Sequence, residues 1–312
     1  MPIATVFIYT VSGADFVIGF FYMKTICLML LLVVLCADGF GQSDLQRMFE
    51  TELSFARAAA EKGVKPAFLE FLSEDSIIFR PDPVNGLAFW NAREESDAAR
   101  LIRKPAYADI ASSGMLGYTT GYWELRPKGK VDSMTEFGQY VTIWEKRQDG
   151  TFRASVDINI RHDKIEFTEP KGFFPTGISK ETNERGWSVA DASMNFLRQS
   201  MRSEGVKGAY KKFAANDVRL LREGSPPITG KKNVVDETDN YVSSAFPKKM
   251  ASLQSADMAY VWNPCEFADS NEGTEKGSCL QVWKLRNKKW LIVLGVFAPV
   301  PNETRPELKI KK

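Results

Sequence analysis

The side chains best suited to chemistry in this sequence are one carboxylate and two phenols, Asp157, Tyr118 and Tyr140, all in segments of strand-like composition. A carboxylate that a strand projects into an apolar pocket has a raised pKa, which suits it to proton transfer. Phenolic hydroxyls beside it could donate hydrogen bonds that stabilise an enolate. Together the three residues predict acid–base chemistry with Asp157 as the general base.

The strand that carries Asp157 also permits a structural interpretation. Every second residue from Phe152 to Ile160 is apolar, and the positions between them are polar or charged: Arg153, Ser155, Asp157, Asn159 and Arg161. Such alternation is typical of a strand with one buried and one polar face. On this interpretation Asp157 lies on the outer, polar face and takes no part in catalysis. Both interpretations stay open at the level of sequence.

A second group of residues could line a binding pocket. Arg80 and Arg222 each follow a predicted strand, where a guanidinium could hold a ligand carboxylate. Pairing with nearby Asp75, Asp82 or Glu223 is the structural alternative. Aromatic residues could form apolar pocket walls or simply fill the core; those in question are Trp123, Trp144, Phe152, Tyr260 and Trp283.

Several classes of function are disfavoured by what the sequence contains. His162 is the only histidine, which excludes catalysis by two histidines and leaves a poor basis for a Ser-His-Asp triad. The spacing of Cys and His predicts no metal site, and no phosphate-binding glycine loop predicts a cofactor. With 41 basic and 39 acidic residues the net charge is +2, which gives no reason to expect nucleic acid as a partner.

Helices and strands that would position these residues follow from periodicity. Apolar residues at helical spacing lie between Ser43, a capping residue, and Gly63, a natural helix stop. Pro66 can open a short second helix, and residues 88–103 predict a third. From 107 to 160 the chain reads as strands and turns. Helices followed by an antiparallel sheet are the order expected of an α+β domain.

The same layout returns later in the chain. With the numbering shifted by 142, Gly63, Phe71 and Arg80 fall on Gly205, Phe213 and Arg222. The shift becomes 139 at Trp144 and Trp283, and 138 at Phe152 and Trp290. One nearly constant shift over so long a stretch indicates a tandem duplication. In the second copy Asn263 stands for Gly121 and Gly295 for Asp157, so the sequence confines candidate functional residues to the first copy.

Three segments carry a family resemblance: Gly117 to Gly121, Gly138 to Trp144, and Asp149 to Phe152, followed by Asp157. They resemble the nuclear transport factor 2-like superfamily, in particular its SnoaL-like members and the branch called domain of unknown function 4440. The resemblance spans about residues 44–162 and is looser in the second copy. It implies two cystatin-like cone domains, each with three helices packed on a bent antiparallel sheet around a pocket.

Three functions are compatible with these features. We favour an exported, non-catalytic or weakly catalytic protein that binds a small apolar or amphipathic molecule in a cone pocket without a cofactor. The first alternative is a cofactor-independent SnoaL-like isomerase, cyclase or hydrolase that uses Asp157. The second is a protein interaction module without a ligand.

The last strand of the second copy, Trp290 to Phe297, is apolar on both faces, so something must cover its second face. We therefore expect the two domains to pack as an intramolecular pseudo-dimer.

The N-terminal region predicts export. Met23 and Lys24 precede an apolar run of 12 residues, Thr25 to Cys36, which is the length of a signal peptide and too short for a bilayer. A membrane anchor is the less favoured alternative. Cys265 and Cys279 then remain in the mature chain, either as a disulfide or as two buried thiols. The expected divisions are an upstream extension (1–22), a signal peptide (23–41), a first domain (42–162), a linker (163–185), a second domain (186–302) and a tail (303–312).

Overall fold

The computed structural model describes residues 44–80, 82–94, 98–127, 129, 136–164, 188–244, 247, 250–269 and 273–300. The expected extension, signal peptide and tail lie outside these residues, as does the expected linker apart from Asp163 and Lys164. Within the described part of the chain, no helix combines the length and apolar character that crossing a membrane requires.

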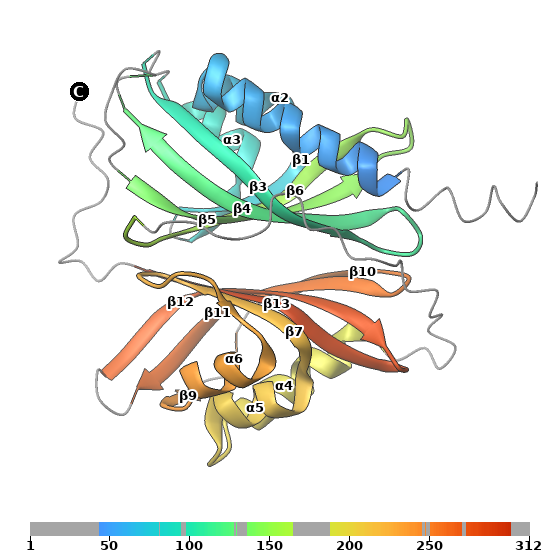
Figure 1. Ribbon diagram of the computed structural model, residues 1–312, viewed down its shortest axis with the longest axis vertical. Helices are drawn as coiled ribbons and strands as arrows, with labels where there is room; N and C mark the ends of the chain where they lie inside the picture. Colours follow the sequence, from blue (N-terminus) through green and yellow to red (C-terminus); the bar gives the residue numbers. More distant parts are fainter. Residues whose placement is uncertain are drawn as a thin grey trace, which may run out of the picture.

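The first half of the chain is a curved sheet that covers helices on one face (Figure 1). A helix over 44–61 is followed by α2 (Val64–Phe71), β1 (Leu72–Phe79), β2 (Pro83–Asn85) and α3 (Gly86–Ala92). The long strands are β3 (Arg100–Ile110), β4 (Leu116–Arg126), β5 (Glu136–Lys146) and β6 (Phe152–Arg161). The order is β2-β1-β6-β5-β4-β3.

Two expectations for this half are corrected. The expected helix over 88–103 is only the short α3, because residues from Arg100 onward pair with β4 instead. Pro105 is accommodated there by a shift in register between Pro105 and Tyr107. The sheet is also mixed rather than purely antiparallel, because β1 runs parallel to β6.

The second half has the same architecture. It contains α4 (Val189–Ser200), α5 (Gly205–Phe213), β7 (Ala214–Arg222), β8 (Ile228–Thr229), α6 (Lys231–Glu237), β9 (Tyr241–Ser243), β10 (Ala251–Ser255), β11 (Met258–Asp269), β12 (Gly273–Arg286) and β13 (Lys289–Pro299). The sheet order β10-β11-β12-β13-β7-β8 is that of the first sheet read from the other edge, and β7 is parallel to β13. The fold is therefore α+β, with two curved sheets that each wrap around helices.

Each half is centred on one cluster of aromatic side chains. The rings are Phe68, Phe71 and Trp144 around Phe55, and Tyr210, Phe213 and Trp283 around Phe196, with centroid distances between 5.1 and 6.3 Å. Edge-to-face contacts at these distances stabilise a core beyond the area that they bury. Trp144 and Trp283 are thus core residues, and both are fully buried.

The two sheets lie against each other through the faces that the helices leave open (Figure 1). One apolar cluster joins them, with Val141, Ile143 and Ile158 from the first sheet and Val282 and Leu294 from the second. Phe79 and Trp262 meet edge to face at 5.9 Å across this contact. The second apolar face of β13 is covered by the first sheet.

One buried ion pair crosses between the sheets, from Lys284 of β12 to Asp109 of β3, and Asp257 of the second half pairs with the same lysine. Nζ of Lys284 lies 3.3 Å from Oδ1 of Asp109 and 3.5 Å from Oδ2 of Asp257, and it donates to the carbonyl oxygen of Ile110 at 2.9 Å. Burial raises the pKa of Asp109, and the opposing effect of Lys284 does not cancel it. The cost of taking the Asp109 charge out of water therefore exceeds what its ion pair returns.

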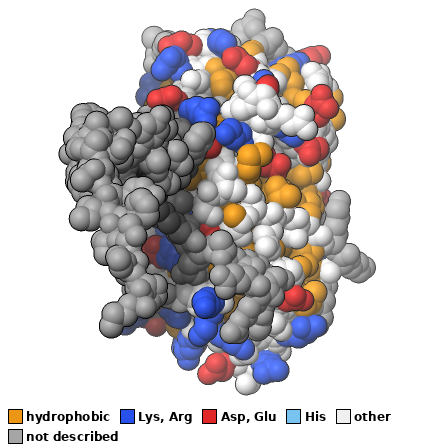
Figure 2. Space-filling model, turned by 90° about the vertical axis from the view of Figure 1, so that its right-hand side faces the viewer, with side chains coloured by type: hydrophobic (Ala, Val, Ile, Leu, Met, Phe, Trp, Pro, Cys, Tyr) orange, Lys and Arg blue, Asp and Glu red, His pale blue; other side chains and the backbone are white. Residues whose placement is uncertain are grey.

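On the outside of the molecule, acidic and basic side chains are mixed. Figure 2 shows both signs at the two ends of one face, with a band of uncharged and hydrophobic side chains between them. This face offers no block of positive charge of the kind that binds a phosphate backbone.

The raised pKa of Asp109 predicts a pH-dependent stability difference. The folded state holds the Asp109 proton to higher pH than the unfolded state, whose pKa is near 3.8, so this contribution to stability is lost as the pH rises from 3.8 through the folded pKa. Asp109→Asn removes the dependence. Urea unfolding at pH 4, 5, 6 and 7 is expected to show that the free energy of unfolding of the variant rises relative to that of the parent as the pH rises. A variant that loses stability relative to the parent as the pH rises would contradict the raised pKa of Asp109.

Candidate functional site

A bulge in β6 decides where Asp157 points. The pairing of β5 with β6 shifts register between Ile143 and Trp144, so Ser155 is an extra residue in β6. Before the bulge, Phe152 and Ala154 face the helices; after it, Val156 and Ile158 face the other sheet. Because an extra residue inverts the alternation, Asp157 turns toward the helices and is 0% exposed. The interpretation that placed Asp157 on an outer polar face is therefore wrong.

Inside the first half, Asp157 belongs to a buried cluster around Arg103 of β3. Arg103 donates from Nε to Glu52 Oε1 at 3.1 Å, from Nη1 to Asp157 Oδ2 at 3.2 Å, and from Nη2 to Thr142 Oγ1 at 2.7 Å. Its Cζ lies 3.7 Å from the ring centroid of Tyr140 and 4.4 Å from that of Phe55. The guanidinium is thus held between two aromatic rings, a favourable cation–π arrangement when it is desolvated. We call this group the Arg103 cluster.

Hydroxyl and amide groups satisfy the remaining oxygen atoms of the cluster. Thr142 donates to Asp157 Oδ2 and Asn159 donates to Asp157 Oδ1, both at 2.8 Å. Thr119 donates to Glu52 Oε2 at 2.6 Å and accepts from Nε1 of Trp144 at 2.9 Å. Each carboxylate oxygen of Asp157 and Glu52 therefore has a partner, as buried charges require.

The electrostatics match this geometry. Burial disfavours the charge on Arg103, but Glu52 and Asp157 more than offset it, so the pKa of Arg103 is raised above its usual value. Burial, reinforced by Glu52, raises the pKa of Tyr140. A general base must be able to reach a substrate proton, whereas the side chains of Arg103, Glu52 and Asp157 are all 0% exposed.

The predicted trio of Asp157, Tyr118 and Tyr140 is only partly brought together. Tyr140 lies against Arg103 and so shares the cluster with Asp157. Tyr118 points the other way and packs between the sheets, with its ring centroid 5.8 Å from that of Tyr107. The three residues therefore do not form one site.

The predicted pocket residues of the first half have structural partners. Arg80 is half-buried over the rings of Phe89 and Trp90 and donates to the carbonyl oxygen of Phe79 at 2.8 Å. Burial lowers the pKa of Arg80, partly offset by Asp157. Trp123 donates from Nε1 to the Gln139 carbonyl at 3.1 Å.

Three other residues singled out by the sequence also lie away from any open site. Phe152 is buried in the core of the first half. His162 is buried, with Nδ1 2.7 Å from the Asp163 carbonyl oxygen, rather than at the surface. Tyr260 lies between the sheets.

A pocket opens in the second half instead, although the sequence placed its candidate catalytic residues in the first copy. Its cavity volume is about 60 Å³, and it opens to solvent at its mouth. Most of its wall is apolar, and contributors from helices and strands include Phe196, Leu197, Leu220, Phe267, Val296 and Phe297. Arg222 lines it as predicted, whereas Trp283 does not and remains in the core.

The pocket lies where two residues of the Arg103 cluster are replaced. Gln281 and Gly295 face each other across β12 and β13, at the place where the first half has Thr142 and Asp157 on β5 and β6. A Cβ on Gly295 would lie 2.5 Å from the hydroxyl oxygen of Tyr210. Glycine therefore places no side chain in this part of the pocket.

The arginine at the mouth of the pocket is already paired with two carboxylates. Arg222 lies 3.3 Å from Glu275 and 3.7 Å from Glu237, and its Cζ is 4.6 Å from the ring centroid of Tyr241. An arginine already paired with two carboxylates is a poor anchor for an anionic ligand.

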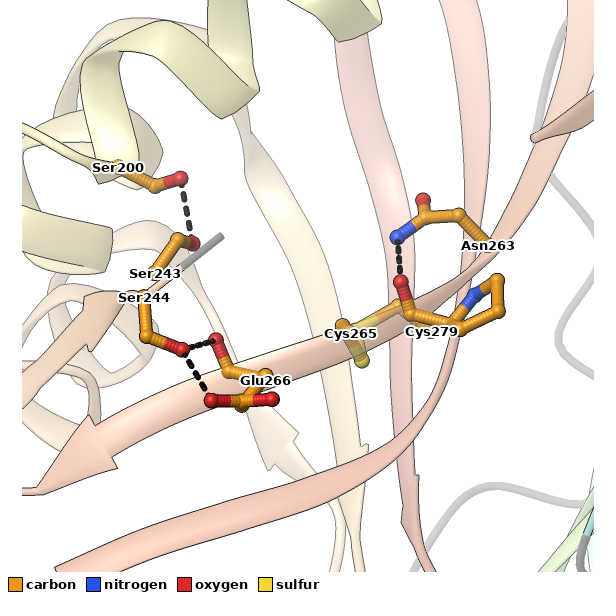
Figure 3. The surroundings of a disulfide bond; sticks show 8 residues. Ser200, Ser243, Ser244, Asn263, Cys265, Glu266 and Cys279 are labelled. Atoms are coloured by element: carbon orange, nitrogen blue, oxygen red, sulfur yellow. Dashed lines mark hydrogen bonds between the residues drawn. A yellow bond between two sulfur atoms is a disulfide. The ribbon is translucent and has the colours of Figure 1, made fainter. Parts of the chain in front are cut away.

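A disulfide between Cys265 and Cys279 fixes β11 to β12 in the pocket wall (Figure 3). Nearby, Ser200 and Ser243 share a hydrogen bond of 2.7 Å, and Ser244 donates to Glu266 Oε1 at 2.9 Å. These links hold β9 and β11 around the pocket. Among the described residues, no group of His, Cys, Asp and Glu is placed to bind a metal.

Comparison with known proteins adds only a likeness of fold. No family model matches, and no curated protein matches the sequence. Similar solved structures include a nuclear transport factor 2-like protein from Cytophaga hutchinsonii, with 15% identity, 36% of this chain and 95% of that chain covered, and a TM-score of 0.31. A protein of unknown function with a cystatin-like fold from Nostoc punctiforme has 15% identity, 36% and 89% coverage, and a TM-score of 0.29. These structures have the fold that the sequence motifs resemble, and such scores carry no conclusion about activity.

Removing the cation from the Arg103 cluster is expected to be severely destabilising. Arg103→Met leaves Glu52 and Asp157 buried without a counter-charge, which costs about 3–5 kcal/mol. Combining it with Glu52→Gln and Asp157→Asn should recover most of the loss. Urea unfolding followed by circular dichroism measures both.

Arg147→Met is the matched control, because Arg147 pairs with Asp75 at the surface at 3.2 Å and is expected to contribute less than about 1 kcal/mol. If Arg103→Met and Arg147→Met lose equal amounts of unfolding free energy, the buried cluster does not have the structural role described.

Proposed function

We propose that this protein binds one small, mostly apolar and uncharged molecule in the pocket of its second half. The observation that carries the proposal is the contrast between the two halves. The first interior is occupied by the buried Arg103 cluster, whereas the second has an open pocket with a mostly apolar wall. An apolar wall with a few polar groups is typical of small-molecule sites.

The charge distribution argues against an anionic ligand. The apolar wall favours burial of a hydrocarbon body, at about 25 cal/mol for each Å² removed from water. Because Arg222 is paired with both Glu237 and Glu275, a ligand carboxylate would have to displace an existing ion pair. This argues against Arg222 as a carboxylate anchor.

The enzyme alternative that uses Asp157 has less support. Both oxygens of Asp157 accept hydrogen bonds from buried groups, so proton transfer to a substrate would require the cluster to open. Export remains part of our proposal, supported by the disulfide, since disulfides persist mainly in oxidising compartments.

We also propose that the first half serves as an intramolecular partner for the second, as in a pseudo-dimer. The apolar cluster between the sheets and the ion pair between Lys284 and Asp109 support this role. Gel filtration with light scattering is expected to show a monomer of the mature chain. A stable dimer would indicate that another chain covers the second apolar face of β13.

Filling the pocket should abolish binding. Gln281 is half-buried, lines the pocket and faces Gly295, so Gln281→Trp places an indole in the empty space. The uncharged fluorescent probe N-phenyl-1-naphthylamine is expected to bind the parent protein and to bind this variant at least tenfold more weakly.

Leu253→Trp provides the control, because Leu253 is 37% exposed on β10 and does not line the pocket. Equal probe binding by Gln281→Trp and the parent, or none by the parent, would contradict the proposal.

A further inference from the structure

Three polar side chains in the pocket wall have hydrogen-bonding capacity that the described residues leave unused. The Tyr210 hydroxyl and the Gln281 amide have no hydrogen-bond partner there, and Asn263 uses only Nδ2, which donates to the Pro264 carbonyl at 2.9 Å (Figure 3). Tyr210 is 5% exposed and Asn263 is 6% exposed. Buried polar groups of a folded protein are normally paired, so unpaired ones that border a pocket point to a ligand.

The sheet register places these groups on one face of the wall. Gln281 pairs with Gly295 across β12 and β13, and the Tyr210 hydroxyl lies over Gly295. Asn263 pairs with Cys279, two residues before Gln281, so their side chains point to the same side. The phenol and the two amides therefore border a common polar area within an apolar pocket.

We infer that this polar area recognises a carbonyl oxygen on an uncharged, apolar ligand. This inference rests on the proposed function of the pocket. Burial raises the pKa of Tyr210, so the phenol keeps its proton and acts as a donor. The Gln281 amide offers a second donor. A ketone, ester or amide supplies the acceptor that both donors lack.

The first half shows what the same framework does without a ligand. Phe68 occupies the position that corresponds to Tyr210 and makes the same contact with the central phenylalanine, at 5.1 Å compared with 5.3 Å. Phe68 has no hydroxyl, and the carboxylate of Asp157 is bonded within the Arg103 cluster. At this position, only the half that has the pocket carries a hydroxyl.

Two probes of matched shape test the inference. Equilibrium dialysis of the full chain compares 2-acetylnaphthalene, which carries a carbonyl, with 2-isopropenylnaphthalene, which does not. The ketone is expected to bind about threefold to tenfold more tightly, the effect of one additional hydrogen bond. Tyr210→Phe should remove this difference by weakening the ketone alone. Tyr260→Phe, which alters a tyrosine between the sheets, should preserve it.

The outcomes separate this inference from the proposed function. If both probes bind but Tyr210→Phe leaves the preference unchanged, or weakens both equally, carbonyl recognition by Tyr210 is wrong while the pocket stands. If neither probe binds the parent protein, both proposals fail. Without ligand, Tyr210→Phe is expected to melt at the same temperature or higher, since it removes an unpaired hydroxyl. A clearly lower melting temperature would assign Tyr210 a structural role and overturn the inference.

Discussion

The buried guanidinium of Arg103 is the constraint around which the first half is built. Once that charge is inside, it needs Glu52 and Asp157 as counter-charges, Thr142 and Asn159 to complete their hydrogen bonds, and two aromatic rings above and below it. Removing any one partner leaves the others buried and uncompensated. The interior is consequently filled by its own side chains, and the residue that looked most like a catalytic base stabilises an arginine.

The second half uses the same sheet order and the same aromatic cluster but has none of this charge. Gly295 replaces the carboxylate of Asp157, and Tyr210 replaces Phe68. The result is a pocket with unused hydrogen-bonding groups. Because the open faces of the two sheets cover each other, the first half can be a rigid, closed partner while the second retains space. Stability and binding are thus assigned to different halves of one chain.

The sequence predicted the α+β class and the two curved-sheet units, because strand alternation, helix stops and the repeat of aromatic residues are local signals. It did not predict the direction of Asp157, since the bulge at Ser155 depends on pairing with β5 and has no local signature. Arg103 was overlooked because its partners Glu52 and Asp157 are far from it in the chain. The sequence does contain a signal for the pocket in the second half. Asp157 aligns with Gly295, which removes a charge, and Phe68 aligns with Tyr210, which adds a hydroxyl at the facing position.

The central claim is that, among the described residues, only the second half has an open interior. Native mass spectrometry of the purified mature chain with 2-acetylnaphthalene tests this claim most directly. The account predicts one bound molecule per chain, or one co-purified molecule that the ketone displaces, and none in Gln281→Trp. Two molecules per chain, no binding at all, or one molecule that persists in Gln281→Trp would contradict it.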